Sequence, residues 1–162
     1  TKEKGLAEFI NSISKLKFHF KFFIIGDGPE KNMLEDLAVK LNIKNKIIFC
    51  GFQNYFQIKK KLKDIDLFVN CSYFEGFPNS VVESLANGTP VLASQSFGGI
   101  NEIILNKNFG NIYKNETQLI NLLQKFNVKR RGHMNQKLIN DHLKKFSISE
   151  NVKKYSNMFE NI

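Results

Sequence analysis

The stretch DLFVNCSYFEGFPNSVVESLANGTPVLAS, residues 66–94, carries the clearest indication of how this chain folds. An apolar run over 66–70 leads into a loop with glycine and proline, a helical pattern follows over 80–87, and a second apolar run covers 90–93. Short apolar runs between turn residues are typical of buried strands, and Gly88 suits the left-handed backbone position that follows a helix. Two such strands joined by a helix predict a βαβ unit with parallel strands.

The same alternation continues on both sides of this unit. Helical patterns cover residues 5–16, 30–41, 54–65 and 100–105, and strand patterns cover 18–25, 46–50 and 110–113. After the last strand come helical patterns over 116–126, 136–146 and 148–159. This order predicts an α/β fold, a Rossmann-like doubly wound parallel sheet with helices on both faces, formed by residues 1–162 as a single domain.

Size and composition agree with one soluble domain. The chain has 162 residues, of which 42% are hydrophobic and 24% charged, and no apolar run approaches the ~18 residues that a membrane helix needs. Its first residues show no secretory signal pattern, and two cysteines, Cys50 and Cys71, are too few for a disulfide framework. We expect a cytoplasmic protein with two buried thiols.

The chain is basic, with a net charge of +9 from 24 lysines and arginines against 15 acidic residues. Such a balance fits a solvated lysine-rich surface, an anionic membrane surface or a nucleic acid. Proteins that recognise a DNA sequence through a groove commonly contact base edges with arginine. The only arginines here are Arg130 and Arg131, and neither lies near a glycine loop in the sequence. We therefore favour a solvated face, with attraction to the inner face of the cytoplasmic membrane, and expect no nucleic acid as partner.

Glycine gathers at the ends of the predicted strands. Six of the ten glycines fall just after a strand: Gly26, Gly28, Gly51, Gly76, Gly98 and Gly99. The carboxyl ends of parallel strands meet at one edge of a sheet, and ligands of such folds bind there. Turns also require glycine, but several such loops at one edge predict a rim that binds phosphate or a nucleotide.

Two glutamates flank the start of the helix predicted over 80–87. That helix start offers unpaired N–H groups and a partial positive charge, which can hold a diphosphate without a metal. Glu75, in the preceding loop, could accept hydrogen bonds from ligand hydroxyls, and Glu83, one turn into the helix, could reach a vicinal diol such as a ribose. The competing interpretation is a capping box formed by Ser80 and Glu83, which would bind no ligand.

Residues 75–94, with residues 66–72 before them, resemble the C-terminal half of GT-B fold retaining glycosyltransferases of the large family 4 type. Further segments resemble the same family in the same order: FFIIGDGP at 22–29, IFCGF at 48–52 and FGGINE at 97–102. The resemblance runs from about Lys4 to Leu123. It implies the donor-binding half of a two-domain enzyme whose N-terminal, acceptor-binding domain is absent from this chain.

The resemblance also implies roles for individual residues. Glu75 would bind hydroxyls of the donor sugar, Glu83 would bind the ribose, and Lys4 would neutralise the diphosphate, so Glu75 and Lys4 are the catalytic candidates. The nucleotide base would pack near Gly51 and Phe52. The full set of donor-binding candidates is Gly26, Gly28, Gly51, Phe52, Gly76, Phe77, Asn79, Ser80, Val81 and Glu83.

Some features depart from the family pattern. An arginine that the family places ahead of the lysine would precede Thr1, and Pro78 has no N–H to offer a ligand. Asp64 and Asp66 resemble the metal-binding Asp-x-Asp of another glycosyltransferase fold, but they lie at the opposite end of the predicted strand. We therefore expect neither a metal nor a cofactor.

The implied function is transfer of a sugar, with retention, from a nucleoside-diphosphate-sugar to a glycan or lipid-linked acceptor. A UDP-sugar is favoured as donor, and bacterial surface polysaccharide or lipopolysaccharide biosynthesis as the setting. This chain alone would bind the donor weakly and turn over nothing. A GT-B epimerase or phosphorylase, and a non-enzymatic basic module that binds nucleotide or nucleic acid, stay open as alternatives.

Overall fold

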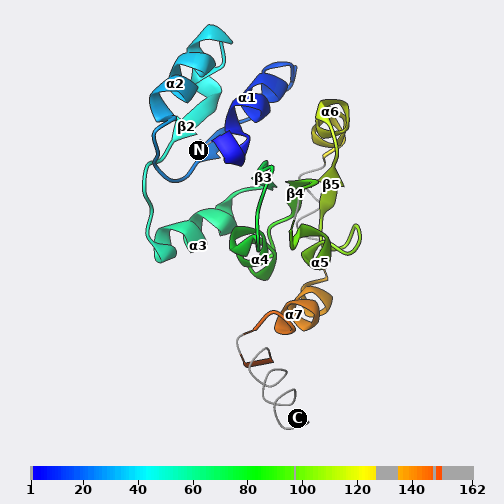
Figure 1. Cartoon of the computed structure of the whole chain (residues 1–162). Helices are drawn as coiled ribbons and strands as arrows, with labels where there is room; N and C mark the ends of the chain where they lie inside the picture. The colour runs from blue at the N-terminus through cyan, green and yellow to red at the C-terminus, as the bar shows by residue number, and fades with distance from the viewer. Residues whose placement is uncertain (1, 97, 127–134, 148, 151–162) are drawn as a thin grey trace.

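A computed structural model of the chain describes residues 2–96, 98–126, 135–147 and 149–150 (Figure 1). Its helices are α1 (Leu6–Ser14), α2 (Lys31–Lys40), α3 (Tyr55–Asp64), α4 (Asn79–Ala86), α5 (Ile100–Ile103), α6 (Glu116–Gln124) and α7 (Gln136–Lys144), with 3-10 turns η1 (Lys2–Lys4) and η2 (Lys44–Lys46). Its strands are β1 (Phe22–Ile24), β2 (Ile47–Phe49), β3 (Phe68–Asn70), β4 (Val91–Ser94) and β5 (Asn111–Tyr113). The last predicted helix, over 148–159, lies almost wholly outside the described residues.

The strands pair in parallel, as predicted. β1 pairs with β2, and β3, β4 and β5 form a second sheet in that order. The sequence pattern predicts one continuous sheet, whereas the hydrogen bonds of the described residues divide the strands between two sheets. The predicted strands also shorten, from 18–25 to Phe22–Ile24 for example, because a ladder extends only as far as its neighbour, and β2 offers three residues.

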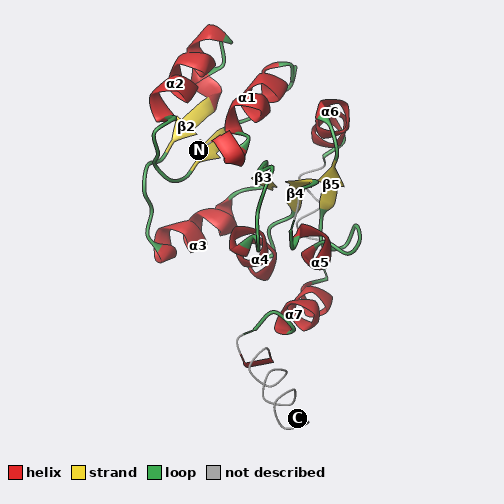
Figure 2. Cartoon of the chain, viewed as in Figure 1, coloured by secondary structure: helices red, strands yellow, loops and turns green. Residues whose placement is uncertain are grey.

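Helices cover both faces of the strands, which confirms the predicted fold class. In Figure 2, α1, α2 and α6 lie on one side of the strands, and α4, α5 and α7 lie on the other. Successive side chains of β4 alternate between the two layers: Leu92 packs in the core with α1 and α2, while Val91 and Ala93 pack with α4 and α5. Each buried aliphatic side chain contributes roughly 1.5–3 kcal/mol.

The two cysteines remain free thiols at the carboxyl ends of strands. Cys71 is buried, as predicted, and burial raises the pKa of its thiol to about 12. Cys50 is half-buried, because it follows β2 at the open edge. No helix among the described residues has the length and apolarity to cross a membrane.

Candidate functional site

A cavity of about 870 Å³ lies between the two sheets. Its apolar part separates β1 from β3 and is lined by side chains of both strands, such as Phe22 and Val69. Its polar part lies at the carboxyl ends of the strands. Half of the residues predicted for the site line this part: Lys4, Gly26, Gly28, Glu75, Ser80 and Glu83. The structure thus brings together loops that the sequence places more than seventy residues apart.

The two predicted catalytic residues contact each other. Lys4 Nζ lies 2.6 Å from Glu75 Oε1, although Lys4 is 52% exposed and Glu75 only 18%. The same carboxylate oxygen accepts a hydrogen bond of 2.9 Å from Ser72 Oγ. Charge-assisted hydrogen bonds are short and strong, so this network fixes the Glu75 carboxylate at the mouth of the cavity, with the Lys4 ammonium beside it.

Close backbone packing places Lys4. Tyr73 N donates to Glu3 O at 2.8 Å, and Cys71 Sγ donates to Lys4 O at 3.1 Å, so η1 docks against the segment that follows β3. Gly5 has a φ of 63°, and a Cβ there would overlap the Cys71 carbonyl oxygen. Glycine is therefore required directly after Lys4.

A second glycine contact supports the loop of Glu75. Gly98 has a φ of 117°, and a Cβ at this position would overlap the Glu75 carbonyl oxygen. Gly99 N donates to Gly76 O at 3.0 Å. The loop after β4 thus lies directly on the loop that carries Glu75 and fixes its backbone.

The start of α4 differs from the capping box that Ser80 and Glu83 could have formed. The helix begins at Asn79, directly after Pro78, and no side chain caps it. Ser80 already lies in the first turn, so it cannot serve as the N-cap. Glu83 lines the cavity, and its carboxylate forms no hydrogen bond or ion pair with the residues that the structure describes. The capping-box interpretation is therefore wrong.

Some backbone N–H groups at the start of α4 already donate hydrogen bonds to carbonyl oxygens of the same segment. Asn79 N donates to Phe77 O and Val81 N donates to Pro78 O, each at 3.0 Å. The Val81 side chain is fully buried, so neither its amide nor its side chain is available to a ligand as predicted. Within the described residues Ser80 N has no backbone acceptor outside its helix, and Ser80 lines the cavity.

The glycines after β1 and β2 lie side by side. Gly26 N donates to Gly51 O at 2.8 Å, which joins the two loops where the strands end. Gly28 N is held by Asp27 Oδ1 at 2.9 Å. Phe52, which follows Gly51, is 83% exposed. Gly51 and Phe52 lie outside the lining of the cavity, next to the loop of Gly26 that lines it.

Helix α7 packs on α4 and α5, and Phe146 beyond its end contacts the loop that carries Glu75; the sequence did not indicate these contacts. Its Gln136 Nε2 donates to Leu85 O at the end of α4, at 3.1 Å. Beyond its other end, the Phe146 ring packs on Phe77, with ring centroids 5.3 Å apart. Between them His142 Nε2 lies 3.0 Å from Ile103 O, and burial lowers the pKa of its imidazole. The sequence shows the helical pattern over 136–146, but it does not show which residues this helix contacts.

We expect Phe146→Ala to loosen the loop that carries Glu75 and Phe77. Removal of this half-buried ring takes a contact from Phe77, which should lower the free energy of unfolding by about 1–2 kcal/mol. The freed loop should also bind a ligand of the cavity more weakly. Urea denaturation and ligand titration measure the two effects. Phe146→Leu should restore most of both. An alanine variant that binds the ligand like the wild type would show that Phe146 does not position the loop.

Asp64 and Asp66, the pair that resembles a metal-binding Asp-x-Asp, lie before β3 and also line the cavity. Asp64 ends α3, and both side chains are exposed. Within the described ranges, no group of three or more His, Cys, Asp or Glu side chains is arranged to hold a metal ion. Lys4, Glu75 and Glu83 line the polar end of the cavity, together with Asp27, Glu30 and Lys31 that follow β1.

Parallel strands wound with helices on both sides, with a polar site at their carboxyl ends, define a Rossmann-like α/β domain of the GT-B type. Solved structures agree: the lipopolysaccharide outer core galactosyltransferase WaaB in its apo form has a TM-score of 0.83 at 21% identity, covering 99% of this chain and 46% of that one. Anabaena HepE in complex with UDP and glucose has a TM-score of 0.84 at 18% identity, covering 100% and 46%.

The sequence profile of the family described as "Glycosyl transferases group 1" matches residues 1–153. The chain belongs to this family. An uncharacterized glycosyltransferase of Methanocaldococcus jannaschii is 38% identical over 106 residues, which cover 64% of this chain and 27% of that protein. The lipopolysaccharide 1,6-galactosyltransferase of Escherichia coli is 25% identical over 114 residues, covering 69% and 32%. The chain thus spans less than half the length of these proteins.

Proposed function

We propose that this chain is the nucleotide-sugar-binding, C-terminal half of a retaining glycosyltransferase. The observation that carries the proposal is that Lys4, Glu75 and Glu83 line one cavity, with Lys4 and Glu75 in contact. An ammonium and a helix start suit a diphosphate, and carboxylates suit sugar hydroxyls. Family membership supports the same assignment.

The reaction that we propose breaks the bond between the anomeric carbon and the diphosphate oxygen. Negative charge develops on the leaving diphosphate, where Lys4 and the N-terminal end of α4 stabilise it. Glu75 orients the donor sugar through its hydroxyls, and Glu83 holds the ribose diol. An acceptor hydroxyl bonds to the anomeric carbon on the face that the leaving group occupied, and its proton passes to the departing phosphate.

Relatives suggest the class of donor and acceptor. HepE was solved in complex with UDP-glucose, and related proteins are named as lipopolysaccharide or undecaprenol-linked sugar transferases. We therefore propose a UDP-sugar as donor and a glycan or lipid-linked acceptor, in bacterial surface polysaccharide or lipopolysaccharide biosynthesis. We also propose a cytoplasmic location, peripheral to the inner face of the membrane.

Titration of the chain with UDP and with uridine tests the diphosphate site. Lys4→Ala should weaken UDP binding about tenfold or more, since hydrogen bonds to charged groups contribute ~1.5–3 kcal/mol, and should leave uridine binding unchanged. Lys2→Ala is the matched control, because Lys2 lies in the same exposed turn outside the cavity. Equal loss in both variants, or none with Lys4→Ala, would contradict the proposed role.

A further inference from the structure

Three exposed aromatic residues gather at the start of α3, outside the lining of the cavity. Phe52, Tyr55 and Phe56 are 83%, 60% and 79% exposed. The rings of Tyr55 and Phe56 meet edge to face, with centroids 5.7 Å apart. Exposed apolar patches of this kind mark surfaces that contact a partner or a membrane.

These rings are held in place by a well-formed helix start. The Asn54 side chain accepts a hydrogen bond of 3.0 Å from Gln57 N, and the Gln57 side chain accepts one of 2.9 Å from Asn54 N. This reciprocal capping box fixes the first turn of α3. The exposure of Tyr55 and Phe56 is therefore a property of the folded helix.

Lysines continue the same outer face of α3. Helical spacing puts Lys59 and Lys60 next to Tyr55 and Phe56, with Lys63 one turn on, while Ile58 and Leu62 face inward. We call this surface the aromatic–lysine face; its members are Tyr55, Phe56, Lys59, Lys60 and Lys63.

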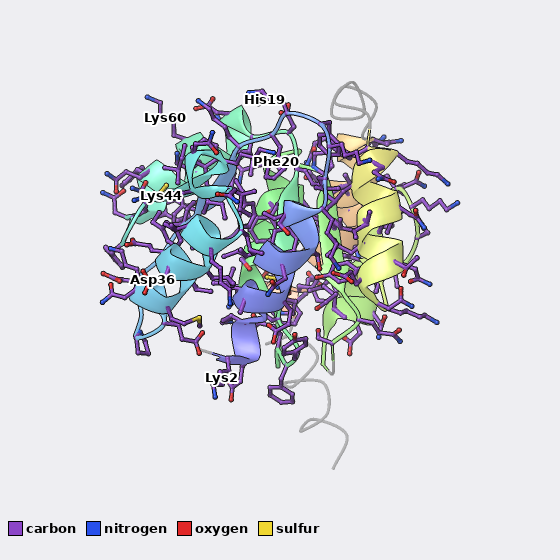
Figure 3. The ribbon with its side chains drawn as sticks, turned by 90° about the horizontal axis from the view of Figure 1, so that it is seen from above. Lys2, His19, Phe20, Asp36, Lys44 and Lys60 are labelled. Carbon is purple, nitrogen blue, oxygen red and sulfur yellow. The ribbon has the colours of Figure 1, made fainter. Side chains whose placement is uncertain are left out.

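Lysine predominates around this face, with Asp64 as the exposed acidic residue that ends α3 beside Lys60. Residues 37–63 contain seven lysines and no aspartate or glutamate: Lys40, Lys44, Lys46, Lys59, Lys60, Lys61 and Lys63. Lys44 and Lys60 lie on the same side of the molecule in Figure 3. A concentration of lysine around exposed rings is complementary to an anionic surface.

We propose that the aromatic–lysine face docks the protein on an anionic lipid bilayer. Aromatic rings favour the headgroup level of a membrane, and nearby lysines are attracted to acidic headgroups. This inference rests on the proposed peripheral location and names the surface that produces it. The face has no arginine and lies on the outer side of a helix, which favours a bilayer over a nucleic acid strand that would need a groove.

Cosedimentation with vesicles tests the proposal. The chain should bind vesicles of phosphatidylcholine with phosphatidylglycerol and not vesicles of phosphatidylcholine alone. Lys59→Glu with Lys60→Glu should lower the partition coefficient at least about 25-fold, since each lysine near the surface contributes about fivefold. Tyr55→Ser with Phe56→Ser should lower it about tenfold. Lys114→Glu with Lys125→Glu, which flank α6, make the same charge change and should leave binding near the wild-type value.

UDP binding and far-UV circular dichroism of each variant separate this proposal from the proposed function. Variants of the aromatic–lysine face should keep both at wild-type values. Equal binding to neutral and anionic vesicles, or equal losses in the Lys114 and Lys59 pairs, would overturn the proposal. The variant Tyr55→Ser with Phe56→Ser could also overturn it. That would be the outcome if the variant still binds vesicles but has lost UDP binding, self-association or binding of a single-stranded oligonucleotide.

Discussion

Replacement of Gly98 by alanine is expected to destabilise the protein and to displace the loop that carries Glu75. The new Cβ would overlap the Glu75 carbonyl oxygen, and the φ of 117° strains any side chain. Backbone strain alone costs ~1–3 kcal/mol, so we expect the free energy of unfolding to fall by at least about 2 kcal/mol. Because Glu75 must move, the affinity for a UDP-sugar should fall further than the affinity for UDP.

Urea denaturation and titration with UDP and UDP-sugar measure these effects. Gly28→Ala is the control for stability, since no heavy atom lies within 4 Å of its Cβ position. That variant should unfold near the wild-type urea concentration. A Gly98→Ala protein as stable as the wild type would show that the two loops do not pack as described.

Glu75→Gln should abolish the preference for a sugar-bearing nucleotide. The carboxylate accepts hydrogen bonds from Lys4 Nζ and Ser72 Oγ. The hydroxyls of a donor sugar would donate further hydrogen bonds to the same carboxylate. Loss of a charged acceptor is worth ~1.5–3 kcal/mol, so UDP-sugar affinity should fall at least about tenfold. UDP alone should bind as well or slightly better, because Lys4 is released and one negative charge beside the diphosphate is removed.

Glu3→Gln provides the matched control. It makes the same charge change one residue from Lys4, and Glu3 is exposed and lies outside the cavity. This variant should bind both ligands like the wild type. A Glu75→Gln protein that loses UDP and UDP-sugar affinity equally would show that Glu75 does not recognise the sugar.

The order of elements could be predicted because it depends on local patterns. Apolar runs, the helical stripe over 80–87 and Gly88 are all visible in the sequence. Which strands pair, and over how many residues, depends on neighbours distant in the chain. The run from Phe18 to Ile25 is rich in apolar residues, with His19 and Lys21 between them, yet only Phe22–Ile24 has a partner strand. Such a run alone cannot show where pairing stops.

The candidate site could be predicted in its residue types better than in its details. Lys4 and Glu75 are 71 residues apart, and no periodicity indicates that they pair at 2.6 Å. The sequence allows a capping box of Ser80 and Glu83, but the helix starts after Pro78, two residues earlier than that box needs. The contact of Phe146 with Phe77 is also invisible to local pattern, since apolar spacing shows that a helix has a buried face but not what it covers.

The role of Glu83 can be tested by ligand-observed NMR with UDP, GDP and CMP, on the wild-type chain and on Glu83→Ala. We expect selective binding of UDP, weakened about tenfold or more by Glu83→Ala. Glu35→Ala, a glutamate of α2 outside the cavity, should bind UDP like the wild type. UDP without its ribose hydroxyls should bind both the wild type and Glu83→Ala with the same weak affinity. Undiminished UDP binding by Glu83→Ala would contradict the account, because the ribose would then be held elsewhere.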